Sequence, residues 1–327
     1  MERKRLIDRT LHQVTNFPSV EAFLESEIDP RGVLTIHDGF VPIDILVSPA
    51  QSDTTICFFH GAIEKHFTLP VLSGLGISGG VSANRVFVSD PSLILDEELL
   101  LAWYAGNFYQ EELQNTLTII LRRIVEELGS QRIVFFGGSG GGFAALYFAS
   151  QFAGSTALVF NPQTNIGKYE KRAIDAYVEK GFLMEPSGTA PLSRLPGTIV
   201  TDLCALYTSA RPVTVGYLQN LNDVNHVNRH LLPFLRAVNP ATDVSLLAER
   251  WNDGHTPPPK KLLSNILDKA SISNEALQDE FKHLGAVSSR DLITSTSKSG
   301  SEGETLVTAT GLVELLGEES VGSFSDE

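Results

Sequence analysis

Cysteine is scarce in this sequence of 327 residues, which contains only Cys57 and Cys204. The two lie far apart, with no Cys-x-x-Cys pair and no Cys/His cluster, which argues against a disulfide framework and a structural zinc site. Cys57 stands inside an apolar run and is expected to be a buried free thiol. Long apolar runs are also missing. Because no stretch reaches the roughly 18 apolar residues that a spanning helix needs, we expect no transmembrane segment.

Positive charge is in short supply as well. The formal net charge is −14, with 25 Lys and Arg against 39 Asp and Glu. Broad binding to nucleic acid or anionic lipid needs clustered basic residues, so neither is expected. The first residues, MERKRLIDRT, are not followed by an apolar segment of signal-peptide length. The sequence therefore predicts no secretion signal and a cytoplasmic location.

The residues that are present predict an α/β fold. An apolar fraction of 42% supports a large core. Two strand-like runs flank Asp38-Gly39, a strong hairpin-turn pair. From residue 54 onward the apolar runs become short and uniform, as in strands buried on both faces of a parallel sheet. The predicted strands are 32–37, 41–47, 55–59, 85–88, 132–136, 156–160, 213–218 and 244–248.

Helical patterns alternate with these strands. They fall at 113–128, 142–152, 231–238 and 260–270. This alternation predicts a doubly wound, mostly parallel sheet with antiparallel strands at its N-terminal edge.

Three regions lie outside this alternation. Residues 1–31 are expected to form a helical lead-in, with a helix at 19–27, to a main domain over 32–285. The segment 161–212 is long for one connection and predicts a lid with helices near 168–180 and 198–209. Residues 286–327 are rich in Ser, Thr, Gly and Glu and are expected to form a disordered acidic tail. Within it, 312–316 is a candidate docking segment for a protein partner.

The most informative segment is the turn Gly137-Gly-Ser-Gly-Gly141, between a buried strand and a helix. It matches the G-x-S-x-G pattern in its expected setting, so Ser139 is a candidate nucleophile. Small residues two positions either side let strand and helix approach closely. The helix N-terminus offers the N–H of Gly140 to the oxyanion of a tetrahedral intermediate. Glycine at every flanking position is unusual and is compatible with a mobile turn or with a closely bound substrate.

Other interpretations of this turn remain open. A Walker phosphate loop is disfavoured, because no lysine is present. A dinucleotide fingerprint fits loosely, since Gly140, Gly142 and Ala145 spell G-x-G-x-x-A. The strand that follows ends in Phe-Asn-Pro rather than in the acidic residue that this fingerprint requires. A purely structural glycine turn is the third possibility.

A serine nucleophile needs a base and an acid, which in this fold class follow it in the order Asp/Glu then His. His255 stands in the loop after the last predicted strand, with Gly254 before it and prolines after it, and is the candidate base. Asp223 follows the penultimate strand and is the candidate acid. Asp253 is the runner-up, although two residues from His255 is awkward geometry, and Asp202 lies within the predicted lid.

Two further features bear on the site. His226 and His230 form H-x-x-x-H after Asp223, but no further ligand is evident, so His226 is a candidate substrate contact and we expect no metal. The turn His60-Gly61-Ala62-Ile63 ends an apolar strand. Its amides at Gly61, Ala62 or Ile63 are candidate second oxyanion donors, with His60 supporting the loop.

Together, the His60-Gly61 turn, the 137–141 turn, Asp223 and His255 resemble the α/β-hydrolase superfamily over about residues 32–270. The resemblance implies a triad of Ser139, His255 and Asp223 and a lid at 161–212. Tyr217-Leu-Gln-Asn with Asp223 and His226 is also similar to bacterial members linked to surface-polysaccharide or glycoprotein modification. We therefore expect a serine esterase or acyltransferase without a cofactor, acting on a small-molecule or glycan ester. The first alternative is a non-catalytic binding or assembly protein. A dinucleotide-dependent enzyme is the second, less favoured alternative.

Overall fold

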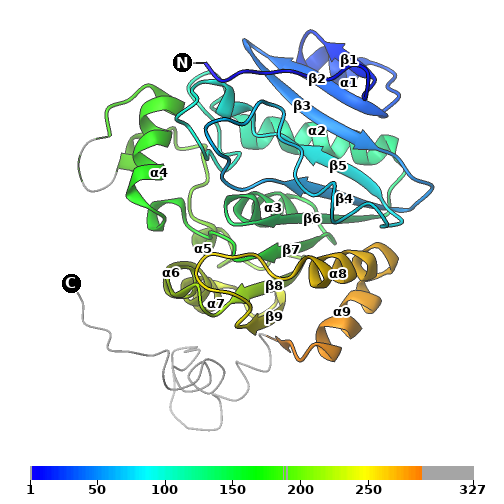
Figure 1. The fold of residues 1–327 in the computed structure, drawn as a ribbon, viewed down its shortest axis with the longest axis vertical. Helices are drawn as coiled ribbons and strands as arrows, with labels where there is room; N and C mark the ends of the chain where they lie inside the picture. The colour runs from blue at the N-terminus through cyan, green and yellow to red at the C-terminus, as the bar shows by residue number, and fades with distance from the viewer. Residues whose placement is uncertain (1, 187, 189–190, 289–327) are drawn as a thin grey trace.

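A ten-stranded mixed sheet organises the molecule in a computed structural model that describes residues 2–186, 188 and 191–288. The strand order is β1-β2-β3-β5-β4-β6-β7-β8-β9-β10 (Figure 1). The strands are β1 Val14–Phe17, β2 Gly32–Asp38, β3 Val41–Ser48, β4 Thr54–Phe59, β5 Asn84–Val88, β6 Arg132–Gly138, β7 Thr156–Phe160, β8 Thr214–Asn220, β9 Asp243–Glu249 and β10 Val287–Ser288.

The pairing confirms the predicted fold class. Strands β5, β4, β6, β7, β8 and β9 run parallel to one another. The hairpin β2–β3 turns at Asp38-Gly39, where Gly39 has a φ of +65°, and β3 pairs antiparallel with β5. Antiparallel strands therefore stand on the N-terminal side of a parallel sheet, as expected.

Helices cover both faces of this sheet, in the doubly wound arrangement. They are α1 Val20–Glu25, α2 Leu113–Glu127, α3 Gly140–Gln151, α4 Lys171–Ala176, α5 Leu203–Leu206, α6 Val224–His226, α7 Leu232–Ala237, α8 Lys260–Ile272 and α9 Asn274–His283. The helices α1, α2, α3, α5 and α7 contribute to the larger apolar core on one face. The helices α8 and α9 contribute to the smaller core on the other.

The central strand β4 shows why these runs are apolar throughout. All six of its residues are buried. Its side chains alternate between faces, with Cys57 and Phe59 in the larger core and Ile56 and Phe58 in the smaller one. A strand whose two faces are both covered by helices has no solvent-facing side that would require polar residues.

Residues 1–31 contain more than the expected helical lead-in. The helix α1 is present, but β1 precedes it and pairs in parallel with β2. At the other end, α9 and the short strand β10 extend past the last predicted helix, and β10 pairs with β9. The expected acidic tail and the docking segment 312–316 lie outside the described residues, apart from 286–288.

Arg3 ties the N-terminal segment to two loops beside the sheet. The side chain is buried, and its guanidinium donates to backbone carbonyls of Leu93, Leu99 and Glu97 at 2.7–3.1 Å. It also donates to the carbonyl of Lys65 at 2.9 Å. Because guanidinium carries five N–H donors, one side chain can satisfy several loop carbonyls at once.

The lid segment is less regular than predicted. Between β7 and β8 the chain forms short helical turns, of which α4 is the longest α-helical one and stands apart from the sheet at the left of Figure 1. The chain then continues from α4 into a π-helical turn at Tyr177–Gly181. None of the helices in the described ranges is long and apolar enough to cross a membrane.

Candidate active site

Ser139 occupies a strained turn between β6 and α3. Its φ is +54° and its ψ is −124°, in the left-handed half of conformational space that a non-glycine residue rarely adopts. The side chain is partly exposed, although its neighbours in β6 and α3 are buried. The turn thus presents the hydroxyl at the end of the sheet, as predicted for this serine.

The glycines around Ser139 are required by packing. A Cβ on Gly137 would lie 2.2 Å from the Gly141 carbonyl oxygen, and a Cβ on Gly141 would lie 2.3 Å from the Phe59 carbonyl oxygen. A Cβ on Gly138 would likewise lie 2.0 Å from the ring of Phe160. The protein's own atoms fill this space, so close packing explains the run of glycines without a mobile turn.

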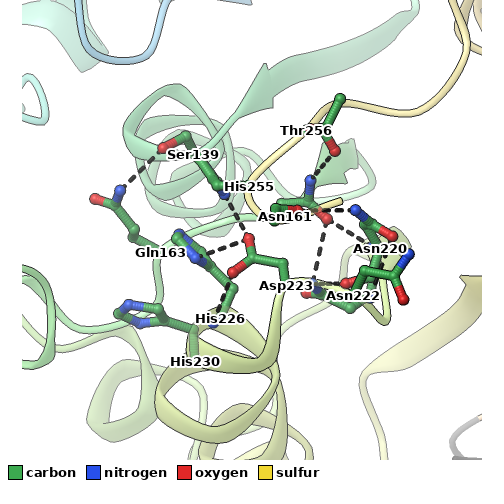
Figure 2. A network of polar contacts seen from close by, with 12 residues as sticks. Ser139, Asn161, Gln163, Asn220, Asn222, Asp223, His226, His230, His255 and Thr256 are labelled. Carbon is green, nitrogen blue, oxygen red and sulfur yellow. Dashed lines mark hydrogen bonds and ion pairs between the residues drawn. The ribbon is translucent and has the colours of Figure 1, made fainter. Parts of the chain in front are cut away.

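The structure brings His255 and Asp223 together. His255 Nδ1 lies 2.5 Å from Asp223 Oδ2, so a carboxylate that only accepts holds the proton of His255 on Nδ1 (Figure 2). Asp223 is buried, whereas the His255 side chain is 38% exposed. Burial by itself would raise the pKa of Asp223, but its close contacts with the His226 and His255 rings bring that pKa well below its usual value.

Two buried asparagines hold the loop that carries His255. Asn220, at the end of β8, donates to the carbonyls of Asn252 and Gly254 at 2.7 and 2.9 Å. Asn161, just after β7, donates to the carbonyl of Thr256 at 2.8 Å and accepts from the Asn220 amide at 2.7 Å. Figure 2 shows both asparagines beside the loop. They went unrecognised in the sequence, where a strand ending in Asn-Pro was noted only for lacking an acid.

His226 packs directly on the candidate base. Its ring stacks on His255 with centroids 4.0 Å apart and planes 14° apart. His226 Nδ1 lies 2.9 Å from Asp223 Oδ2, yet the contact lacks hydrogen-bond geometry, and neither ring nitrogen has a hydrogen-bond partner among the described residues. Burial lowers the pKa of His226, which favours the neutral imidazole.

His230 has a structural contact instead. Its Nδ1 accepts from the backbone N–H of Thr164 at 3.2 Å, and burial lowers its pKa to about 3. This bond ties the start of the lid to the segment after α6. Of the other candidate acids, Asp202 caps α5 by accepting from the amide of Cys204 at 2.9 Å.

Asp223, His226 and His255 form a group whose potential ligand atoms lie within 4.8 Å of one another. The lone pairs of a neutral imidazole lie in the ring plane. Because the two rings are nearly parallel, these lone pairs do not converge on one point. Both Nδ1 atoms instead lie beside one carboxylate oxygen, Asp223 Oδ2, at 2.5 Å for His255 and 2.9 Å for His226.

Gln163 is the residue that the sequence did not indicate. It is fully buried, and its Nε2 donates to Ser139 Oγ at 2.9 Å. Its Oε1 accepts from the indole N–H of Trp103, which fixes which end of the amide faces the serine. Among the described residues no hydrogen bond joins Ser139 to His255, so Gln163 is the side chain that holds the hydroxyl in this structure. The segment between β7 and β8, predicted to be a lid, supplies this contact, and no local pattern signals it.

The candidate oxyanion donors differ in whether their backbone N–H already donates to a carbonyl of the protein. A Cβ on Gly61 would lie 3.4 Å from the Cβ of Ser139 and 3.8 Å from the Gly140 nitrogen, so these residues are neighbours. Gly140 is the first residue of α3, whose initial amides have no intrahelical acceptor. The Ile63 N–H, however, donates to the Leu100 carbonyl at 2.9 Å. Ile63 is therefore corrected from candidate donor to a residue that anchors the loop.

His60 supports the turn at Gly61, as the sequence predicted. It is buried, its Nδ1 lies 2.7 Å from the Gly61 carbonyl, and its Nε2 accepts from the Asp90 amide at 3.1 Å. The Nε2 contact identifies Nδ1 as the protonated nitrogen. Burial lowers the pKa of His60 to about 4, so this imidazole stays neutral and structural.

Ser139 and His255 line the same cavity. This cavity has a volume of about 300 Å³, and its other lining residues include Gly61 and Ala62 as well as the rings of Phe58, Phe136 and Phe160. A larger cavity of about 730 Å³ lies between α4 and the loop at 98–101. It shares Ala62 and Tyr169 with the first cavity but is lined by neither Ser139 nor His255. The smaller cavity is therefore the one that contains the candidate nucleophile and base.

The strand order, the strained serine turn and the positions of Asp223 and His255 after β8 and β9 together decide the fold type. The chain has an α/β-hydrolase fold. No protein-family model matches the sequence, and neither does any curated protein.

Solved structures with a similar chain path include three enzymes. The capsule O-acetyltransferase of Neisseria meningitidis serogroup A is 13% identical, with 80% of this chain and 95% of that chain covered and a TM-score of 0.49. The proline iminopeptidase of Mycobacterium smegmatis is 10% identical, with coverages of 78% and 98% and a TM-score of 0.40. The acylaminoacyl peptidase of Pyrococcus horikoshii is 12% identical, with coverages of 83% and 42% and a TM-score of 0.46. At these values the α/β-hydrolase fold rests on this chain's own topology.

Proposed function

We propose that this protein is a serine esterase or acyltransferase that works through an acyl-enzyme on Ser139. The observation that carries the proposal is the His255–Asp223 hydrogen bond of 2.5 Å, with His255 lining the same cavity as a serine in a strained strand-to-helix turn. A hydroxyl is a weak nucleophile, and a base oriented by a buried acid is the usual means of activating it.

In the proposed reaction, Ser139 Oγ attacks the carbonyl carbon of an ester or thioester and His255 Nε2 takes the hydroxyl proton. The amides of Gly140 and of Gly61 or Ala62 stabilise the negative oxygen that forms. His255 then returns the proton to the leaving group as its bond to the carbonyl carbon breaks. Water or an alcohol, deprotonated by His255, attacks the acyl-enzyme, and His255 returns that proton to Ser139 Oγ as the bond between Oγ and the acyl carbon breaks.

Gln163 has a defined part in this proposal. By donating to Ser139 Oγ it leaves the hydroxyl's own proton free to point elsewhere, toward His255. The serine–base hydrogen bond in ligand-free enzymes is often long and tightens when substrate binds. We therefore assign Gln163 as a positioning residue that fixes the rotamer of the nucleophile.

The cavity at Ser139 indicates the kind of acyl group. Its walls carry Phe58, Phe136, Phe160 and Ile77. Rings and aliphatic groups stabilise an apolar chain by removing it from water. At about 300 Å³ the cavity holds a small acyl group such as acetyl with room to spare and is small for a long fatty chain.

The test is labelling by a fluorophosphonate probe, which reacts with activated serines. We expect labelling of the wild-type protein, none of Ser139→Ala, and strongly slowed labelling of His255→Ala. Mass spectrometry of the labelled peptide checks the site. Labelling that persists unchanged in Ser139→Ala would remove the basis of the proposal.

A further inference from the structure

A second, polar cavity borders His255. It has a volume of about 290 Å³ and shares His255 and Tyr169 with the cavity at Ser139, but Ser139 does not line it. In place of the phenylalanine rings it carries Asn225, Arg229 and Lys168. The candidate base thus stands where an apolar cavity and a polar cavity meet.

The proposed chemistry needs two compartments of this kind. An ester has an acyl part and an alcohol part, and the base that exchanges a proton with the alcohol oxygen must reach both. If the acyl part lies in the apolar cavity with Ser139, the alcohol part extends past His255 into the polar cavity.

His226 offers an unsatisfied contact to a ligand in the polar cavity. The side chain is 5% exposed and lines this cavity, and while its Nδ1 lies 2.9 Å from Asp223 Oδ2, its Nε2 has no hydrogen-bond partner among the described residues. A buried polar group without a partner is unfavourable, and a ligand that supplies the missing bond removes that penalty. A hydroxyl group both donates and accepts, so it matches His226 Nε2 in either tautomer of the neutral ring.

The remaining walls favour an uncharged ligand with several hydroxyls. Lys168 and Arg229 are balanced by Glu170 and Asp223, so the cavity has no excess of one sign that would select a phosphate or a carboxylate. Tyr169 adds an aromatic ring, against which the C–H face of a saturated ring can pack. From these contacts we infer that the polar cavity binds the alcohol part of the substrate as a sugar or a similar polyol. This inference rests on the proposed function.

The larger cavity by α4 is a poorer place for the alcohol. Its cations Lys171 and Lys180 are paired with Asp175 and Glu179 at 2.5 and 2.6 Å. It also does not reach His255, so a hydroxyl bound there would lie away from the base. Arg172, which lines it, therefore provides a matched control for Arg229.

The experiment compares esters of one acid with two kinds of alcohol. The probes are 6-O-acetyl methyl glycosides of glucose, galactose and mannose, and cyclohexylmethyl acetate, which has a ring of similar size without hydroxyls. We expect the full-length protein to favour at least one glycoside ester by about tenfold or more in kcat/KM, in the range typical of buried polar contacts. The ratio of kcat/KM for the glycoside ester to kcat/KM for cyclohexylmethyl acetate should fall toward one in Arg229→Gln and in His226→Phe, and Phe keeps a ring against His255. The same ratio should stay unchanged in Arg172→Gln.

Because each ratio compares two esters in the same variant, a general loss of activity cancels. Failure of the wild-type protein to hydrolyse any of the esters would count against the proposed function itself. Hydrolysis with a ratio near one, or a ratio that survives both Arg229→Gln and His226→Phe, would overturn the polar-cavity inference alone. A ratio lost only in Arg172→Gln would place the alcohol in the larger cavity and would overturn it as well.

Discussion

At the scale of single residues, Ser139 is distinguished by the side chain that touches its hydroxyl. Gln163 donates to Ser139 Oγ and is itself held by Trp103. Replacing Gln163 with Glu keeps the size of the side chain but exchanges a donor for an acceptor. We expect acylation of Ser139 by the fluorophosphonate probe to slow by about 10²-fold, because a carboxylate at this position accepts the hydroxyl proton and turns it away from His255.

The control for that substitution is Trp103→Phe. It removes the indole donor to Gln163 while leaving the Gln163 amide in place, so the loss in labelling rate should be smaller than in Gln163→Glu. Equal labelling rates in wild type and Gln163→Glu would show that the contact has no part in activating the serine.

The packing of the serine turn leads to a second residue-scale prediction. A methyl group on Gly141 would meet the Phe59 carbonyl oxygen at 2.3 Å, and backbone cannot move aside as a flexible side chain can. Gly141→Ala should lower the free energy of unfolding by about 3 kcal/mol or more, at the upper end for an overpacked core. Gly76 is the control, because a methyl group added there would meet no atom within 4 Å beyond its chain neighbours. Gly76→Ala should change the free energy of unfolding, measured in urea, by less than about 0.5 kcal/mol.

The sequence predicted that Ser139, Asp223 and His255 lie at one end of the sheet because each follows a strand, and the carboxyl ends of parallel strands gather at one edge of the sheet. It could not identify Gln163. That side chain reaches Ser139 through the course of the lid after β7 and through Trp103, 60 residues away in the chain. The Ile63 amide was misjudged for a similar reason, since its acceptor at Leu100 belongs to another loop.

At the scale of elements, one carboxylate serves both a helix and the candidate site. Asp223 is the N-cap of α6, where it accepts from the His226 amide at 3.2 Å, and it also holds His255. These two roles predict different results for Asp223→Asn and Asp223→Ala. Asn caps a helix about as well as Asp but cannot serve as the charged acceptor that orients His255.

We therefore expect Asp223→Asn to keep the wild-type unfolding free energy within about 1 kcal/mol while esterase turnover falls by about 10⁴-fold. Asp223→Ala should lose a further ~1 kcal/mol from the missing cap. Thermal unfolding and turnover, measured on both variants, separate the roles. Near-normal turnover in Asp223→Asn would leave capping as the only role of this carboxylate.

Strands with both faces buried were predictable, whereas peripheral elements were not. β4 is buried throughout and apolar from Ile56 to Phe59, and its predicted position is within one residue of the observed one. β1 is the four-residue segment VTNF, and its strand state depends on pairing with β2. β10, with two residues, depends in the same way on β9. Such short segments are specified by their neighbours, so a local pattern carries little information about them.

At the scale of the whole molecule, buried titratable groups predict how stability changes with pH. Burial lowers the pKa of His60 to about 4 and that of His230 to about 3, and it also lowers the pKa of His226. Between these values and the ordinary histidine value of 6.5, the unfolded chain binds more protons than the folded one. Stability contributed by the three histidines is therefore lost as the pH falls below about 6.5.

Asp90 acts in the opposite direction. Burial raises its pKa from 3.8 to about 6, so between these values the folded state binds the extra proton. The histidines outnumber it, and we expect the free energy of unfolding to fall by at least about 1.4 kcal/mol per pH unit between pH 6 and pH 4.5. Urea unfolding at a series of pH values measures this slope. A flat profile, or one that rises on acidification, would contradict the assignment of neutral buried imidazoles.

The buried guanidinium near the start of the chain has a practical consequence. Arg3 binds the backbone at Lys65 and Leu99, on either side of the pairing between Ile63 and Leu100 that shapes the oxyanion turn. A shortened gene that begins at β2, the first strand of the hairpin, would remove Arg3 and its hydrogen bonds to these loops. The shortened protein would keep Ser139, His255 and Asp223 but lose the hydrogen bonds that hold the loop beside Ser139.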